Sequence, residues 1–198
     1  QLELLRVYQL AFIRMGEPDA TTAARVAKKF DVFYPAKTDA LNRELSTLLV
    51  YLKSPTIIAK TIALMRQEST KTNAERMDEL LNRNRGYGDT VFKVLTNGAD
   101  LQKLHYLFVL RNLRDGWTMD QRTFYFKWLS DARKNSGGAS YQGFLNNIEK
   151  DAFDNASEIE RLAIEAAGLR KPFTMKQLPK PKGPGRDWKL DELSLIHI

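Results

Sequence analysis

The chain contains no cysteine among its 198 residues. This absence excludes disulfide bonds, cysteine-ligated zinc, a cysteine nucleophile and covalently attached haem within the chain. It does not specify a cellular compartment, because a protein without cysteine folds in reducing and oxidising surroundings alike.

Long apolar runs are also missing. A helix that crosses a bilayer needs roughly 18 to 20 apolar residues, and the longest apolar stretches, such as LLVYL at 48–52, are far shorter. We therefore expect no membrane-spanning segment in this chain. The chain begins at Gln1 without a methionine. We expect a cut end there, so the lack of a targeting segment says nothing about the full protein.

Histidine is scarce, and no pattern typical of a catalytic site is present. His105 and His197 are the two histidines, and no H-E-x-x-H motif, nucleophile elbow or paired-acid spacing accompanies them. His105 could act as a metal ligand or a general base, but a helix-packing histidine with a hydrogen-bonded ring explains it better. The sequence predicts no catalytic residue, metal site or cofactor within this chain, which we do not expect to be an enzyme.

The basic residues are concentrated at the C-terminal end. The net charge is +7; residues 1–169 carry 24 basic and 21 acidic groups, whereas residues 170–198 carry seven and three. A nucleic-acid-binding protein more often has a basic stripe on its folded body. The C-terminal lysines and arginines could contact nucleic acid or acidic lipid, but a solvated linker is the simpler interpretation. No nucleic-acid partner is expected.

What the chain does have is helical periodicity. With 43% hydrophobic and 10% aromatic residues it has a globular composition, and its apolar residues recur every three to four positions. The predicted helices cover about 2–15, 20–29, 39–53, 55–65, 75–82, 90–97, 99–114, 118–134, 141–153 and 157–167. Very short turns between helices, within 48–65 and again within 106–129, predict antiparallel hairpins. We predict an all-α fold in which these hairpins stack as a HEAT-like α-solenoid.

Local rules also predict individual helix starts and one buried face. Asp39 and Ser140 are expected to cap the helices that follow them, and Ser54 to cap the helix that follows the next proline. Thr118 stands three residues before Gln121, which predicts a capping box. The buried face of the helix near residue 105 is predicted to consist of Leu101, Leu104, Leu107, Phe108 and Leu113.

Four regions are expected along the chain. They are a HEAT-like helical domain (1–169), an extended Pro/Lys-rich linker or tail (170–187), the truncated start of a following element (188–192) and a suspected read-through segment (193–198). Proline and glycine make the linker semi-rigid and extended. The last segment, LSLIHI, can be read as CTG-TCT-CTT-ATA-CAC-ATC, which resembles a mosaic-end sequencing adapter. We therefore give His197 no role.

An aromatic cluster is the first candidate for a binding site. Trp117, Phe124, Tyr125, Phe126 and Trp128 crowd into twelve residues and could stack nucleic-acid bases. The three- to four-residue spacing of Phe124, Tyr125 and Trp128 is more typical of the core face of an amphipathic helix. On that interpretation Phe126 packs against a neighbour on another face.

Two glycine-containing turns are the other candidates. SGGAS (136–140) lacks the Gly-Lys-Ser/Thr ending of a phosphate loop and follows a helix rather than a strand. RNRGYGDT (83–90) places Arg83 and Arg85 before two glycines and a helix start, which could hold an anion. A turn capped by Asp89 is the alternative, because that carboxylate would itself occupy the helix start and repel an anion.

Three stretches carry a resemblance to a known family, which spans roughly residues 38–192. They read LNRELSTLLVYLKSP (41–55), RNLRDGWTMDQRTFYFKWLSDARKNSGGASYQGFLNNI (111–148) and GPGRDWKLDEL (183–193). The chain resembles the helical region that precedes the c-type cytochrome domain of planctomycete-type, membrane-bound dehydrogenase-like multidomain proteins. The second stretch is the most specific of the three.

The resemblance implies an extracytoplasmic or periplasmic helical segment of a larger protein, with an oxidoreductase activity that belongs to its other domains. Haem c would belong to a downstream domain, since this chain lacks the cysteines that attach it. The expected partners are neighbouring domains of the same polypeptide, and the expected role is a non-catalytic scaffold or spacer. The alternative is an anion- or nucleic-acid-binding helical repeat that uses Arg83, Arg85 and the basic tail.

Overall fold

Helices make up nearly all of the regular structure that can be described. The computed structural model describes residues 2–67, 98, 100–135 and 140–170. Over these residues the chain forms helices and no strand, so the all-α prediction is confirmed there. The helices are α1 (Leu2–Met15), α2 (Ala20–Asp31), α3 (Asp39–Tyr51), α4 (Ile57–Arg66), α7 (Leu101–Leu110), α8 (Met119–Ala132), α9 (Tyr141–Asp154) and α10 (Glu158–Ala166).

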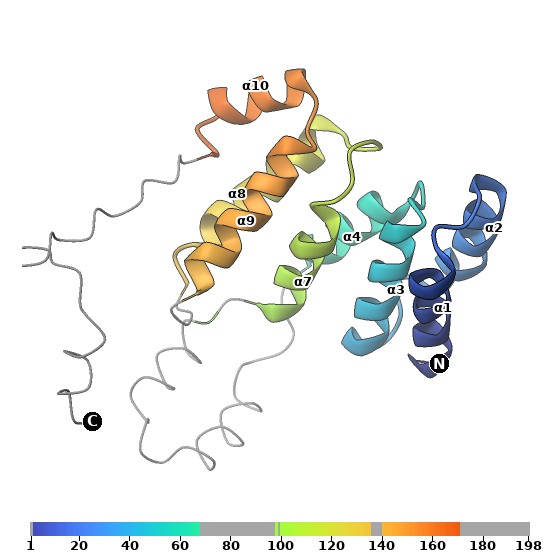
Figure 1. Ribbon diagram of the computed structural model, residues 1–198. Coiled ribbons are helices and arrows are strands. Elements are labelled where there is room, and N and C mark those ends of the chain that lie inside the picture. The colour runs from blue at the N-terminus through green and yellow to red at the C-terminus, as the bar shows by residue number, and fades with distance from the viewer. Residues whose placement is uncertain (1, 68–97, 99, 136–139, 171–198) are drawn as a thin grey trace, which may run out of the picture.

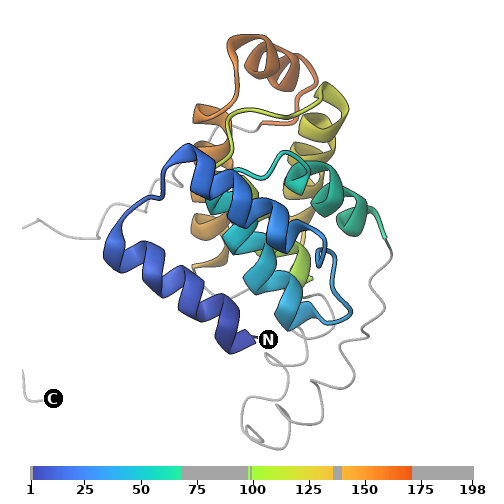
Figure 2. The same cartoon turned by 90° about the vertical axis from the view of Figure 1, so that its right-hand side faces the viewer.

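The most extensive packing joins helices that are not consecutive in the chain, α3 with α7 and α1 with α3 (Figure 1). α1 and α2 lie at one edge and pack against α3, which also contacts α4 and α7. α4 contacts α7 and α8, while α9 packs on both α7 and α8, and α10 covers one end of α8. Figure 2, turned toward the N-terminal edge, shows α1 and α2 in front of the other helices.

One apolar core runs through these layers. Leu49 of α3, Leu107 and Leu110 of α7 and Tyr125 of α8 have no solvent-exposed surface. Tyr125 also donates a hydrogen bond from its hydroxyl to the carbonyl oxygen of Leu107, at 2.7 Å. A buried tyrosine needs such a partner for its hydroxyl, and this one joins α8 to α7.

The local rules for helix starts succeed at some positions and fail at others. The capping box is confirmed, because Thr118 accepts from the amide of Gln121 while the Gln121 side chain accepts from the amide of Thr118. The cap of α3 is Thr38 rather than Asp39. Ser140 stands at the start of α9 but makes no capping hydrogen bond from its side chain.

The buried face predicted around α7 is partly wrong. Leu104, Leu107 and Leu113 are buried, but Leu101 is 53% exposed and Phe108 is 39% exposed. Leu101 is the first residue of α7. Phe108 lies under the guanidinium of Arg111, 3.6 Å from the ring centre, and stacks on Phe144.

The predicted tail falls outside the described residues. The linker from residue 171 onward, the element at 188–192 and the terminal segment 193–198 all lie there, as do the helices predicted at 75–82 and 90–97. Among the helices of the described ranges, none combines the length and apolarity that a membrane crossing requires.

Candidate functional site

The aromatic cluster contributes to the core. Tyr125 and Phe126 are fully buried, so neither ring can stack a base. Trp117, Phe124 and Trp128 are half-buried and pack against that core. The indole N–H of Trp117 is also engaged, because it donates to the carbonyl oxygen of Leu113 at 3.0 Å. The core interpretation therefore holds, although Phe126 is more deeply buried than Phe124 or Trp128.

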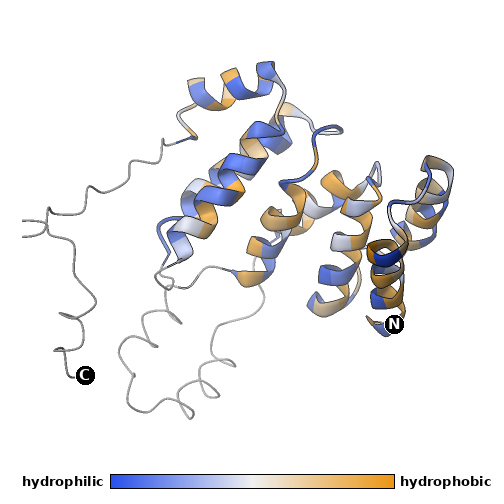
Figure 3. Ribbon diagram, viewed as in Figure 1, coloured by the Kyte–Doolittle hydropathy of each residue, from blue (hydrophilic) through white to orange (hydrophobic). Residues whose placement is uncertain are grey.

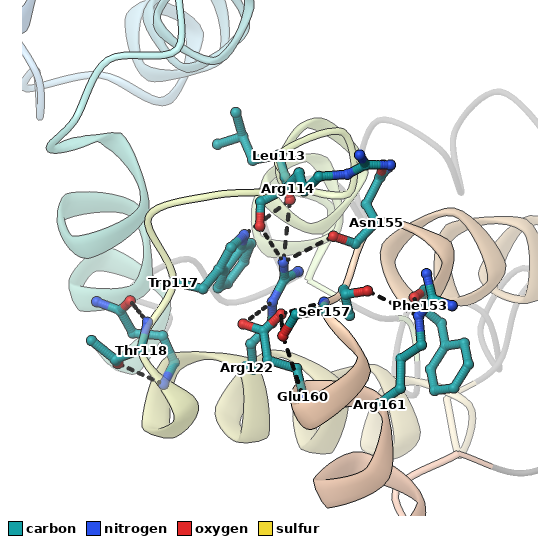
Figure 4. Close-up of polar contacts among 12 residues, drawn as sticks. Leu113, Arg114, Trp117, Thr118, Arg122, Phe153, Asn155, Ser157, Glu160 and Arg161 are labelled. Atoms are coloured by element: carbon teal, nitrogen blue, oxygen red, sulfur yellow. Dashed lines mark hydrogen bonds and ion pairs between the residues drawn. The ribbon is translucent and has the colours of Figure 1, made fainter.

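The same stretch contains a buried arginine that the sequence did not single out. Arg122 lies on α8 with no exposed surface, and its Nε donates to Oε1 of Glu160 on α10 at 3.1 Å (Figure 4). Its Nη2 donates to three backbone carbonyl oxygens, of Arg114 at 3.0 Å, Leu113 at 3.4 Å and Asn155 at 3.5 Å. Arg122 thus joins the α7–α8 turn, the α9–α10 turn and α10.

Aromatic packing and an unpartnered nitrogen complete the surroundings of Arg122. The guanidinium carbon lies 4.2 Å from the ring centre of Trp117, which is the geometry of a cation–π contact. Nη1 is buried and has no hydrogen-bond partner among the described residues. Burial lowers the pKa of Arg122, and the hydrogen bond to Glu160 opposes that shift. Every hydrogen bond that Arg122 makes within the described residues runs to the protein's own backbone or to Glu160, so the side chain joins helices.

Glu160 is the anionic partner of Arg122, and it also takes part in the capping box of α10. Burial would raise the pKa of its carboxyl, but hydrogen bonds from the Ser157 amide and from Arg122 outweigh burial and hold the pKa below its usual value. Its Oε2 accepts from the Ser157 amide at 2.7 Å, which forms the capping box of α10. One carboxylate therefore starts α10 and attaches it to α8.

A second polar cluster surrounds Asp31, at the end of α2. Its carboxylate accepts from Ser54 Oγ at 3.0 Å, from Thr56 Oγ1 and from Lys60 Nζ at 2.7 Å. Ser54 therefore donates to Asp31, contrary to the prediction that it caps α4. The actual N-cap of α4 is Thr56, whose side chain makes no capping bond. A negative charge near the start of α4 is also favourable for the helix dipole.

Asp31 makes the stability of the fold pH-dependent. Burial would raise the pKa of its carboxyl, but hydrogen bonds from Lys60, Thr56 and Ser54 outweigh burial and lower it. Because the pKa of Asp31 is lower in the folded state, the ionised carboxylate stabilises the fold. This contribution to the free energy of unfolding is complete above the unfolded-state pKa of about 4. It is lost as the pH falls through the folded-state pKa.

We expect Asp31→Asn to lower the free energy of unfolding at pH 7 by about 1–2 kcal/mol, because a charge-assisted acceptor of three side chains is lost. Urea unfolding at pH 7 and at pH 3 measures the effect. The difference between the variant and the wild type should shrink at pH 3, and an equal difference at both pH values would contradict it. Asp131→Asn is the matched control, since that carboxylate is exposed and forms an ion pair with Lys134, three residues away.

A pocket of about 630 Å³ opens beside the Asp31 cluster. Small side chains on α2 leave this space; its lining includes Ala20, Ala23, Ala24 and Ala27 of α2 and residues 51–56 of the α3–α4 connection. The volume is in the range of small-molecule sites. Beside the alanines, the lining carries the charged side chains of Glu17, Lys28 and Lys53. Asp31, Ser54 and Thr56 also line it, and both hydroxyls already donate to the Asp31 carboxylate.

His105 has the packing role that the sequence favoured. Its Nε2 lies 3.2 Å from the carbonyl oxygen of Arg43 and 3.3 Å from Ser46 Oγ. Burial lowers the pKa of the imidazole, which the hydrogen bond to Arg43 opposes, so the ring is neutral at pH 7. Ser46 is fully buried and cannot meet a substrate. Within the described residues no group of three metal-ligating side chains comes together.

The anion-site candidates Arg83 and Arg85 lie outside the described residues, as do residues 136–139 of the SGGAS turn. Comparison with protein-family models, curated proteins and solved structures finds no match to this chain.

Proposed function

We propose that the chain is a non-catalytic helical scaffold, built of antiparallel hairpins stacked in the HEAT-like manner. It would space the neighbouring domains of a larger, haem-c-containing, dehydrogenase-like protein in an extracytoplasmic compartment. One observation carries the proposal: two ion pairs with little exposed surface connect helices that are not consecutive in the chain. Arg122 with Glu160 joins α8 to α10, and Asp31 with Lys60 joins α2 to α4.

The mechanism is geometric. Stacked hairpins that bury a continuous core form a stiff body, and buried polar bonds between the layers oppose sliding of one helix past the next. The extended proline-rich tail at 170–187 would then set the reach to the domain that follows. The haem would be held in that domain, because a c-type haem needs two cysteines and this chain has none.

The sequence of the intact gene tests whether the chain belongs to a larger haem-c-containing protein. Under this proposal the reading frame of the intact gene continues past codon 192 into a domain with a C-x-x-C-H motif. An intact gene that continues without such a motif would overturn the haem-protein context.

The scaffold proposal also predicts that the isolated chain does not bind nucleic acid. We expect no saturable change in fluorescence anisotropy when a labelled 20-nucleotide strand, or the corresponding duplex, is titrated at 50 mM salt with up to about 100 µM protein, since non-specific binders reach micromolar affinity under such conditions. Micromolar binding that weakens steeply with salt would contradict the scaffold proposal and favour the nucleic-acid-binding alternative. In that case Arg83→Ala with Arg85→Ala would be compared with Arg25→Ala on the exposed side of α2.

A further inference from the structure

The outward face of α1 is an apolar surface. Leu5 is buried and Tyr8 packs against the core. On the opposite side of the helix, Val7 and Leu10 are 60% and 52% exposed, and Leu4, 53% exposed, lies at the margin between the two sides. Single exposed apolar residues are ordinary, but several on one helix face indicate an interaction surface.

The exposed residues follow the spacing of a coiled-coil seam. Glu3, Val7, Leu10 and Arg14 are all exposed and are separated by four, three and four positions, which is the spacing of heptad a and d positions. The two apolar residues form the centre of this seam and the two charged residues its ends. Neither Glu3 nor Arg14 forms an ion pair within the described part of the chain.

We propose that α1 pairs with α1 of a second copy of this chain in antiparallel orientation. The seam is self-complementary about a two-fold axis that passes between residues 8 and 9. That axis places Val7 opposite Leu10 of the partner subunit, and Glu3 opposite Arg14 of the partner subunit. Both contacts occur twice, as a symmetric dimer requires.

The charges specify the direction of pairing. In a parallel pair, Glu3 would meet the partner's Glu3, and Arg14 would meet the partner's Arg14, so both ends of the seam would repel. In the antiparallel pair both ends attract. Leu4 and Ala11 flank the seam on one side and extend the apolar contact.

The position of α1 in the fold leaves this face accessible. α1 lies at the edge of the helical array and packs on α3 through its inner side. Figure 2 looks onto this edge and shows α1 and α2 in front of the other helices. Figure 3 shows hydrophobic colouring along α1. The inference does not depend on the proposed scaffold function, since it concerns only how two copies of the chain meet.

Sedimentation equilibrium of the 198-residue chain tests the association. We expect a monomer–dimer equilibrium with a dissociation constant on the order of 10–100 µM, as suits a small interface. Leu10→Glu should raise that constant at least about a hundredfold, because the buried leucine is lost from both subunits. Ile159→Glu is the matched control: Ile159 is 75% exposed on α10, and the variant should dimerise like the wild type.

Exchange of the charges tests the orientation. Arg14→Glu and Glu3→Arg should each raise the dissociation constant about tenfold, because two attractive pairs become repulsive. The two substitutions together should restore it to within about threefold of the wild type. Circular dichroism checks that each variant stays helical.

The absence of native cysteine allows a direct readout by cross-linking. Under mild oxidation, Glu3→Cys mixed with Arg14→Cys should form a disulfide dimer, whereas neither variant alone should do so efficiently. Four results would each overturn the inference: a monomer up to about 1 mM, dimerisation of Leu10→Glu with wild-type affinity, failure of the double charge exchange to restore association, or efficient cross-linking of Glu3→Cys with itself.

Discussion

Replacing Arg122 with alanine is expected to lower the free energy of unfolding by about 3–5 kcal/mol, because the change would leave the largely buried carboxylate of Glu160 without its cation. Glu160 would lose its bond from Nε, and the carbonyl oxygens of Leu113, Arg114 and Asn155 would lose the donor that Nη2 provides. Urea unfolding followed by far-UV circular dichroism measures the change. The melting temperature should fall by about 10 °C.

Two comparisons separate the buried pair from a general effect of losing charge. Lys127→Ala removes an exposed cation from the same helix and should change stability by no more than about 0.5 kcal/mol. Arg122→Met combined with Glu160→Gln should cost about 1–3 kcal/mol less than the sum of the two single changes, since neither partner is then left charged and alone. A loss below about 1 kcal/mol for Arg122→Ala would contradict the role of this side chain.

Phe126→Ala is expected to destabilise the fold by a similar amount, about 3–5 kcal/mol, because a fully buried phenylalanine leaves a large cavity when truncated. Its ring lies edge-on to that of Tyr125, with ring centres 5.5 Å apart, so the loss includes an aromatic contact as well as apolar burial. Thermal unfolding of the variant and the wild type at the same protein concentration measures the effect.

Phe124 provides the matched control for Phe126. It lies on the same helix two residues earlier, is only half-buried, and has the guanidinium of Arg66 4.9 Å from its ring centre. Phe124→Ala should therefore cost about 1–2 kcal/mol, less than half of the effect at Phe126. Equal losses at the two positions would show that the ring of Phe126 is not the more deeply buried one.

The successful sequence predictions rest on short-range rules. Thr118 and Gln121 are three residues apart and satisfy each other's backbone, so their capping box is visible in the sequence alone. The extents of α1, α2 and α3 follow from apolar spacing and from breakers such as Gly16, which has a left-handed φ of 90°. The three- to four-residue spacing of Phe124, Tyr125 and Trp128 also predicted that the aromatic cluster belongs to the core.

The failures have long-range causes. Ser54 satisfies a local rule for an N-cap, but Asp31, 23 residues away, takes its hydroxyl instead. Nothing near Arg122 reveals that its partner is Glu160, 38 residues later. A clue was available, because positions 122, 125, 126 and 129 share one helix face whose other members are apolar. A charged residue on a core face calls for a buried partner, but the identity of that partner depends on how α10 folds back.

The packing of α3 has a consequence for how the fold comes apart. α1 and α2 pack mainly against α3, whereas α3 also contacts α4 and α7. Once the bonds of Asp31 to Ser54, Thr56 and Lys60 open, the N-terminal pair can detach as a unit while the aromatic core of α7, α8 and α9 keeps its contacts, as expected for local unfolding in low-stability segments. Loss of α3 removes the support of four helices at once. Among the helices that the structure describes, α1 and α2 are thus expected to open first, and the loss of α3 marks the point at which opening becomes global unfolding.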